Sequence, residues 1–229
     1  MCGRYASTRS AADLSALFEA VDETGSLPPR YNLAPTDPVP VVWRPRPGPR
    51  RIAVARWGLL PHWVKDPRAG VKMINARAET VATSPAFATA FAGRRALLPA
   101  DGWYEWRRLP GGGKQAYFLT PADGSVLALA GLWSRWGAER LLSVAVVTTV
   151  ASGALTTVHD RMPLLLPPDR WEEWLSGHPA LTPPGPDALA RLEIRPVGPA
   201  VGNVRNDGRE LVTKVDAKPT TDGSLPRLF

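Results

Sequence analysis

Apolar and polar positions along the chain divide it into helices and short strands. Apolar residues at helical spacing, with a capping serine before the first two segments, predict helices over 11–21, 85–92, 169–175 and 187–192. Alternating segments bounded by Gly and Pro predict strands over 39–44, 52–57, 95–99, 102–108, 115–119, 126–132, 141–149 and 162–166. Because most strands follow one another directly, we expect an α+β fold with a mostly antiparallel, barrel-like β core and a few flanking helices.

The 229 residues predict one domain over 1–211, followed by a flexible polar tail over 212–229. No apolar stretch approaches the roughly 20 residues that a membrane span needs, so no membrane partner is expected. We expect a cytoplasmic, nucleoid-associated monomer.

Charge points weakly to a nucleic-acid partner. The chain carries 28 Lys and Arg against 21 Asp and Glu, a net charge of +7, together with nine Trp. Arginine, which binds phosphate in a bidentate manner and stacks on aromatic rings, far outnumbers lysine. A GC-rich genome would give a similar composition, so charge alone does not decide the partner. With one Cys and three scattered His, neither a disulfide nor a structural metal site is expected, and we predict no metal and no cofactor.

The only cysteine, Cys2, directly follows the initiator Met1. Removal of Met1 would leave an α-amine beside the thiol, and an α-amine has a pKa of about 7.7–8.0, well below that of lysine. A fraction of this amine is therefore neutral and nucleophilic at physiological pH. The alternative is that Cys2 is a small apolar residue leading into a first strand, and the sequence favours neither interpretation.

Three further segments carry residues suited to chemistry. Alternation in an extended segment places Asn75, Arg77 and Glu79 on one face, where an amide and a cation suit the reading of a nucleic-acid backbone. A polar surface strand with a salt bridge is the alternative.

The other two segments contain candidate acids and bases. Glu105 lies among aromatic residues, whose desolvation would raise its pKa, although Arg107 opposes that shift. His159 adjoins Asp160 and Arg161 before an apolar strand and is the side chain most easily used as a proton shuttle. An exposed edge-strand glutamate and a structural histidine are the respective alternatives.

Taken in order, seven motifs resemble one family. MCGR, RYNLAP, WGLLPHW, INARAET, ADGWYEW, VHDRMP and VGNVRND are similar to those of the SOS response-associated peptidase (SRAP) family, the abasic-site processing proteins. The resemblance runs from Cys2 to about Leu211.

The resemblance implies capture of abasic sites in single-stranded DNA as a covalent protein–DNA crosslink. The Cys2 amine would condense with the abasic aldehyde to a Schiff base, and the thiol would then close a thiazolidine ring. By motif, Asn75 would hold the sugar or the Cys2 amine, Glu105 would move protons, and His159 would act as acid or base. The expected phosphate contacts and base-stacking residues are Arg4, Arg77, Arg161, Trp57 and Trp63. The family name also implies removal of Met1, by the protein itself or by an aminopeptidase.

Two other functions stay open at this point. N-terminal-nucleophile glutamine amidohydrolases also begin Met-Cys-Gly and use the freed cysteine. A non-catalytic single-stranded DNA-binding protein would use the same arginines and tryptophans without needing Cys2.

The C-terminal end suggests a separate partner. A polar tether ending in Leu225, Leu228 and Phe229 resembles short motifs that dock on the replication sliding clamp. The alternative is that Phe229 folds back on the core.

Overall fold

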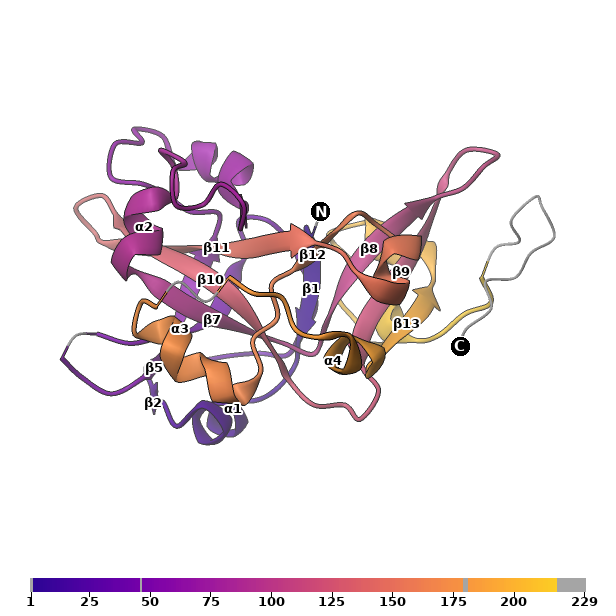
Figure 1. Ribbon diagram of the computed structural model, residues 1–229, viewed down its shortest axis with the longest axis horizontal. Helices are drawn as coiled ribbons and strands as arrows, with labels where there is room; N and C mark the ends of the chain where they lie inside the picture. Colours follow the sequence, from indigo (N-terminus) through magenta and orange to yellow (C-terminus); the bar gives the residue numbers. More distant parts are fainter. Residues whose placement is uncertain (1, 46, 179–180, 218–229) are drawn as a thin grey trace.

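The computed structural model describes residues 2–45, 47–178 and 181–217. Five of its strands close into a barrel (Figure 1). In barrel order these are β11 (Leu141–Val150), β10 (Leu127–Trp136), β7 (Arg95–Ala100), β4 (Pro38–Trp43) and β5 (Arg51–Trp57). Neighbours pair antiparallel, except that β5 meets β11 in parallel and closes the ring. The predicted α+β fold with a largely antiparallel, barrel-like core is confirmed.

Period-two alternation along the strands separates the inside of the barrel from its outside. On β4, Val39, Val41 and Trp43 belong to a buried cluster that takes alternate residues from all five strands. Val42, between them, belongs to a second cluster that also contains residues of the flanking helices. The barrel is therefore filled by side chains and is covered on its outer surface.

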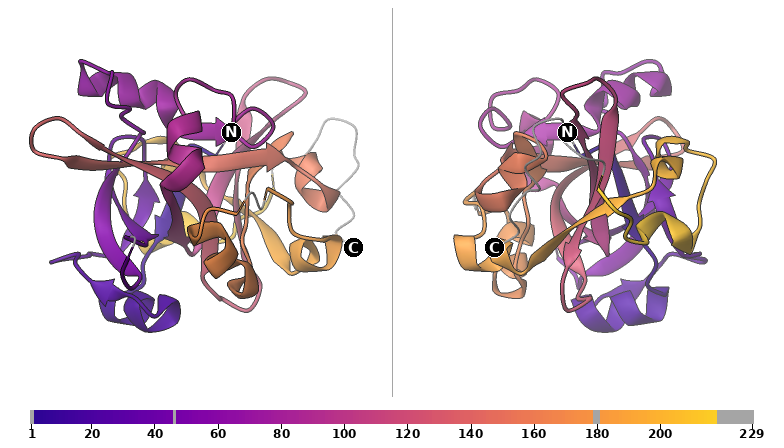
Figure 2. Two further views of the ribbon diagram at one scale, coloured as in Figure 1. Left: turned by 60° about the vertical axis from the view of Figure 1, so that its left-hand side comes forward. Right: turned by 90° about the vertical axis from the view of Figure 1, so that its right-hand side faces the viewer.

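A second sheet extends from the barrel along the long axis of the molecule (Figures 1 and 2). Its strands, in order, are β13 (Leu192–Val197), β9 (Lys114–Pro121), β8 (Gly102–Arg108), β1 (Arg4–Ser7) and β3 (Arg30–Leu33). One face adds Trp103 and Leu119 to the cluster inside the barrel. The opposite face packs Tyr104 and Phe118 into a third cluster. The sheet thus covers one end of the barrel.

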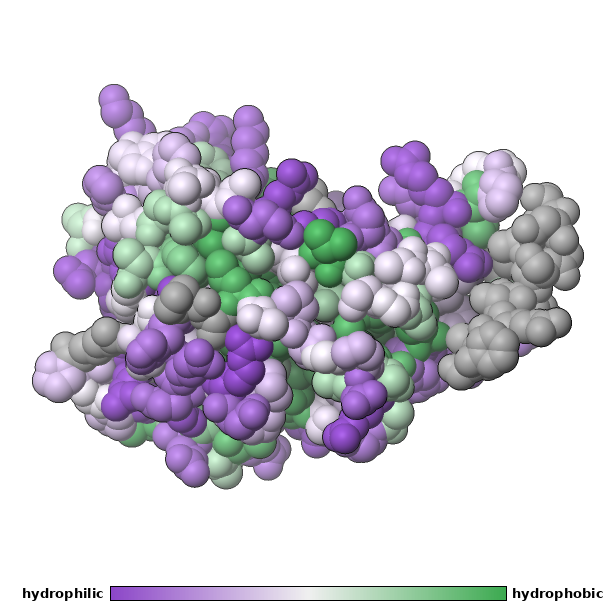
Figure 3. Space-filling view, in the orientation of Figure 1, coloured by the Kyte–Doolittle hydropathy of each residue, from purple (hydrophilic) through white to green (hydrophobic). Residues whose placement is uncertain are grey.

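The helices are short and lie outside the two sheets (Figure 2). They are α1 (Ala11–Phe18), α2 (Ala88–Gly93), α3 (Trp171–Leu175) and α4 (Pro186–Ala190). Short strands are β2 (Val21–Asp22), β6 (Asn75–Arg77) and β12 (Arg161–Pro163). The 3₁₀ helices are η1 (Pro67–Met73), η2 (Gly153–Thr157), η3 (Pro168–Arg170), η4 (Pro199–Gly202) and η5 (Arg209–Val212). On the face in Figure 3, apolar residues form a band from beside α2 toward α4, with hydrophilic residues around it.

All four predicted helices differ from the structure at a boundary, and the last ends at Ala190 because β13 begins at Leu192. The first helix ends at Phe18 because Glu19 adopts a left-handed conformation (φ 49°), and the next residues pair with β5 as β2. The second begins at Ala88, since the Ser84 carbonyl accepts from the amides of Phe87 and Ala88 in a turn that includes Pro85. Local turn geometry therefore replaces the predicted first helical turn.

The C-terminal segment is described as far as residue 217. After η5, Lys214 forms an isolated bridge with Val197, and the Val215 amide donates to the Pro196 carbonyl at 2.9 Å. Leu225, Leu228 and Phe229, the predicted clamp-binding residues, lie outside the described residues. Among the described helices, none combines the length and the apolar character needed to cross a membrane.

Candidate active site

Cys2 is fully buried where the second sheet meets the barrel, in the same cluster as Tyr5 and Trp103. Burial raises the pKa of the Cys2 thiol, and the negative charge of Glu105 raises it further. The thiol is therefore held in its protonated form at neutral pH.

Asn75 ties Cys2 to the barrel. β6 pairs in parallel with β11 through Asn75 and Val146, and this register places the Asn75 side chain beside Cys2. Asn75 Nδ2 donates to the Cys2 carbonyl oxygen at 2.8 Å. Its Oδ1 atom is buried and has no hydrogen-bond partner among the described residues. One amide group thus fixes the Cys2 backbone and keeps an acceptor unused beside it.

Glu105 and His159 line one cavity of about 570 Å³, together with Trp106, Arg108, Lys114 and Val158. Glu105 projects from β8, and Oε1 accepts from the Trp106 amide at 3.3 Å. Glu105 is almost entirely buried, with only 4% of its surface exposed. A buried carboxylate and an imidazole therefore line the same cavity.

His159 is held by polar groups from its own loop. Its Nδ1 atom lies 2.9 Å from the Arg161 amide nitrogen and 2.7 Å from a carboxylate oxygen of Asp160. The amide can only donate, so it matches an unprotonated Nδ1, whereas the carboxylate can only accept and matches a protonated one. A hydrogen-bond donor and an acceptor therefore both lie at this nitrogen.

The four predicted catalytic residues converge, although they come from four separate parts of the chain. Asn75 contacts Cys2, the charge of Glu105 acts on the Cys2 thiol, and Glu105 shares its cavity with His159. No group of His, Cys, Asp and Glu suited to holding a metal ion occurs within the described ranges. The arrangement offers a nucleophile, a positioned amide and two proton-transfer groups.

The predicted DNA-contacting residues divide into two groups. Arg77 is exposed at the end of β6, and Trp63 has 54% of its surface exposed. Trp57, by contrast, is fully buried, packs edge-on against Tyr5 and donates from its indole to the Ile74 carbonyl at 3.1 Å. Trp57 is therefore a core residue, and its prediction as a base-stacking residue was wrong.

Two predicted phosphate-binding arginines are engaged within the fold. Arg161 binds both carboxylate oxygens of Glu79, at 2.7 and 3.0 Å, and its side chain also donates to the Thr148 carbonyl at 2.8 Å. Arg4 donates to Asn32 Oδ1 and to the Val201 carbonyl, both at 2.9 Å. The charge of Arg161 is therefore neutralised by Glu79, whereas Arg4 is held by neutral oxygens and keeps its positive charge.

The RYNLAP and VGNVRND motifs form a clasp between β3 and the loop after η4. Asn32 is fully buried, and its Nδ2 donates to the carbonyls of Val201, Asn203 and Asn206 at 3.3, 3.1 and 2.9 Å. Asp207 accepts from the Asn32 amide at 3.1 Å. These motif residues therefore hold the second sheet together.

Sequence reasoning missed the basic rim of the cavity. Arg108 and Lys114 face each other across the β8–β9 hairpin and both line the cavity. The Gly111-Gly112-Gly113 turn was the signal that pairs these two strands, but their charges were not assigned to the site.

Known proteins share the sequence and the fold of this chain. The family model described as SOS response associated peptidase (SRAP) matches residues 1–204. The chain is 33% identical over 227 residues to the abasic site processing protein YoaM of Bacillus subtilis, covering 93% of this chain and 97% of that protein. It is 34% identical over 228 residues to the abasic site processing protein YedK of Escherichia coli, covering 94% and 100%. A solved structure of a protein from Bacteroides thetaiotaomicron shares the fold, with a TM-score of 0.80 at 19% identity, covering 93% of this chain and 100% of that one. The chain therefore belongs to the SRAP family.

Proposed function

We propose that this protein processes abasic sites by capturing them covalently in single-stranded DNA through Cys2. The observation that carries the proposal is the 2.8 Å hydrogen bond from Asn75 to the Cys2 carbonyl, which anchors the only cysteine where the charge of Glu105 acts on its thiol. Glu105 in turn shares a cavity with His159. Relatives of similar length are named abasic site processing proteins, which supports the substrate class.

The reaction begins once Met1 has been removed. The Cys2 amine attacks the aldehyde carbon of the opened deoxyribose, and loss of one water forms a C=N bond. The Cys2 sulfur then adds to the same carbon, while its proton passes to the nitrogen, and a five-membered thiazolidine closes. Amine and thiol sit on neighbouring carbons, so this second step is intramolecular and strongly favoured.

Each neighbouring side chain has one task in this scheme. The unused Oδ1 of Asn75 accepts a hydrogen bond from the Cys2 amine and orients it toward the sugar. Glu105 takes the thiol proton and returns it to the imine nitrogen, because its charge acts directly on that thiol. His159 binds the hydroxyl freed by ring opening and acts as acid or base.

The strand is held by groups around the cavity. Arg77, Arg108 and Lys114 are the cations that contact phosphates, since the part of the chain that the structure describes pairs none of them with a carboxylate within 4.0 Å. Trp63 is exposed and stacks on a base.

A denaturing gel tests the proposal. Met1-trimmed protein is mixed with single-stranded DNA carrying one abasic site, and intact DNA and the Cys2→Ala variant run alongside. We expect an adduct only with abasic DNA and Cys2, with the mass of protein plus DNA minus one water. Equal, non-covalent binding of both DNAs would support the plain single-strand binder. Absence of any DNA binding, with hydrolysis of glutamine, would support the amidohydrolase.

We further propose that the site removes Met1 itself, by hydrolysis of the Met1–Cys2 peptide bond. Intact masses of the wild-type protein and the Glu105→Ala variant, purified in parallel, distinguish the two routes. Retention of Met1 only in the variant is expected. Complete removal in both proteins would assign the step to a separate aminopeptidase.

A further inference from the structure

Two tryptophans close the barrel at the end farthest from the second sheet. Trp43 is the last residue of β4, and Trp133 lies near the end of β10. Their rings lie 4.9 Å apart at an angle of 58°. The β10–β11 hairpin beside them projects away from β1 and the second sheet (Figure 1). This region is therefore separate from the site around Cys2.

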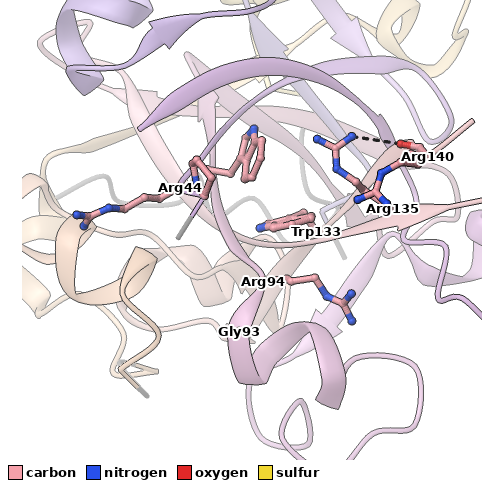
Figure 4. Close-up of a pocket in the computed structure, with 8 residues that line it drawn as sticks. Arg44, Gly93, Arg94, Trp133, Arg135 and Arg140 are labelled. Carbon is pink, nitrogen blue, oxygen red and sulfur yellow. Dashed lines mark hydrogen bonds between the residues drawn. The ribbon is translucent and has the colours of Figure 1, made fainter. Parts of the chain in front are cut away.

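A cavity of about 550 Å³ opens beside these rings and is lined by arginines from several elements. Figure 4 shows the guanidinium groups of Arg94, Arg135 and Arg140 on one side of Trp133, whereas Arg44 points the other way. Arg44 forms an ion pair with Glu172. Three cations thus gather on the Trp133 side.

These three arginines have no carboxylate partner within the described ranges. Arg135 instead donates to the Arg140 carbonyl at 3.4 Å, which brings the two cationic residues together. Arg140 also adopts a left-handed backbone (φ 53°), a conformation that costs a non-glycine residue free energy. Clustered like charges repel, and an anion bound between them would offset that repulsion.

The tryptophans supply a second, independent indication of a ligand. Trp43 has only 8% of its surface exposed, and its buried Nε1 atom has no hydrogen-bond partner among the described residues. Trp133 is half-buried and lines the same cavity. The Arg135 guanidinium lies over the Trp43 ring, 5.5 Å from its centre. The cavity therefore combines the aromatic surface of Trp133 with three arginines, one of them positioned by Trp43.

We propose that this cavity binds a nucleotide, with the phosphate on Arg94, Arg135 and Arg140 and the base stacked on Trp133. Its volume lies within the roughly 300–1,000 Å³ of small-molecule sites. Guanidinium groups match phosphate oxygens, and every base offers a face for stacking on an aromatic ring. The nucleotide belongs either to a DNA strand or to a free pool. This site is independent of the covalent chemistry at Cys2.

Isothermal titration tests the proposal with three probes: thymidine monophosphate, inorganic phosphate and a short intact deoxythymidine oligonucleotide. The test variant combines Arg135→Ala and Arg140→Gly. Glycine tolerates the left-handed conformation, so the change at Arg140 adds no backbone strain. Circular dichroism of the double variant at the titration temperature checks that it is folded. Arg205→Ala is the matched control, since Arg205 is exposed and lies in the loop after η4.

We expect thymidine monophosphate to bind the wild type and the control equally, and the double variant at least about tenfold more weakly. Tighter binding of the oligonucleotide through the same arginines would identify a strand as the source, and binding of the mononucleotide alone would identify a free nucleotide. Unchanged binding of both probes to the double variant, or no binding to the wild type, would overturn the proposal. Equal affinity for inorganic phosphate would overturn the role of Trp133.

Discussion

Asn75 uses the two polar atoms of its amide differently. Nδ2 is committed to the Cys2 carbonyl, whereas the buried Oδ1 is left without a protein partner. Buried acceptors are normally satisfied, so an unused one beside a nucleophile is informative. In our proposal the acceptor is filled when the Cys2 amine appears after trimming.

Replacing Asn75 with alanine tests this interpretation. The hydrogen bond that anchors the Cys2 backbone and the acceptor that orients its amine would both be lost, so we expect adduct formation to slow by about ten- to a hundredfold. The rate is measured under single-turnover conditions with trimmed protein and abasic DNA. Asn206→Ala, which removes one side-chain hydrogen bond far from Cys2, is the control. An unchanged rate in Asn75→Ala would exclude the orienting role.

The buried Cys2 thiol makes stability depend on pH. Burial raises its pKa in the folded state, so the folded protein keeps the proton above about pH 8.5, where an unfolded thiol loses it. This contribution is fully present below that pH and declines as pH rises toward the folded-state pKa, by up to about 1.4 kcal/mol per pH unit. Urea unfolding of the wild type and Cys2→Ala between about pH 7.5 and 9.5 measures it. We expect the wild type to lose more free energy of unfolding than the variant; parallel losses would contradict this account.

At the scale of elements, the clasp between β3 and the loop after η4 depends on Asn32. Alanine at this position would leave buried carbonyls and the Arg4 side chain without their partner. We expect Asn32→Ala to lower the free energy of unfolding by about 2–4 kcal/mol, measured by urea denaturation.

Asn206→Ala is again the matched control, because its half-buried side chain makes one hydrogen bond, to the Ala200 carbonyl at 2.8 Å. Its cost should be about 1 kcal/mol. Similar losses in the two variants would show that the clasp is not specific to Asn32.

Alternation predicted the barrel strands well because their inner and outer residues face different clusters. It missed β3 and β13, which lie at the two edges of the second sheet, and Pro196 further weakens the pattern in β13. The end of α1 was missed as well, since a non-glycine residue, Glu19, takes the left-handed conformation that usually marks a glycine.

The candidate site could be predicted only in part for a related reason. Its residues were named from their motifs, but nothing in their spacing brings Asn75 to Cys2, because that contact depends on the parallel pairing of β6 with β11. The burial of Trp57 was equally hidden, since a tryptophan ending a strand suits either a core or a stacking surface.

At the scale of the whole molecule, the barrel separates the two proposed sites. The second sheet covers one end and encloses Cys2, and the cavity lined by Trp133 and Arg135 opens at the other. A net charge of +7 favours approach of nucleic acid to the molecule as a whole. The proposed covalent capture, however, needs only the end of the barrel that encloses Cys2.

The most direct test of the account compares the stability of adducts formed by the wild type and Cys2→Ser. Both keep the N-terminal amine after trimming, but serine lacks the thiol that closes the thiazolidine ring. We predict that the wild-type adduct survives heating without a reductant, and that the serine adduct persists only after borohydride reduction of its imine. An equally heat-stable serine adduct without reductant would contradict capture by amine and thiol together.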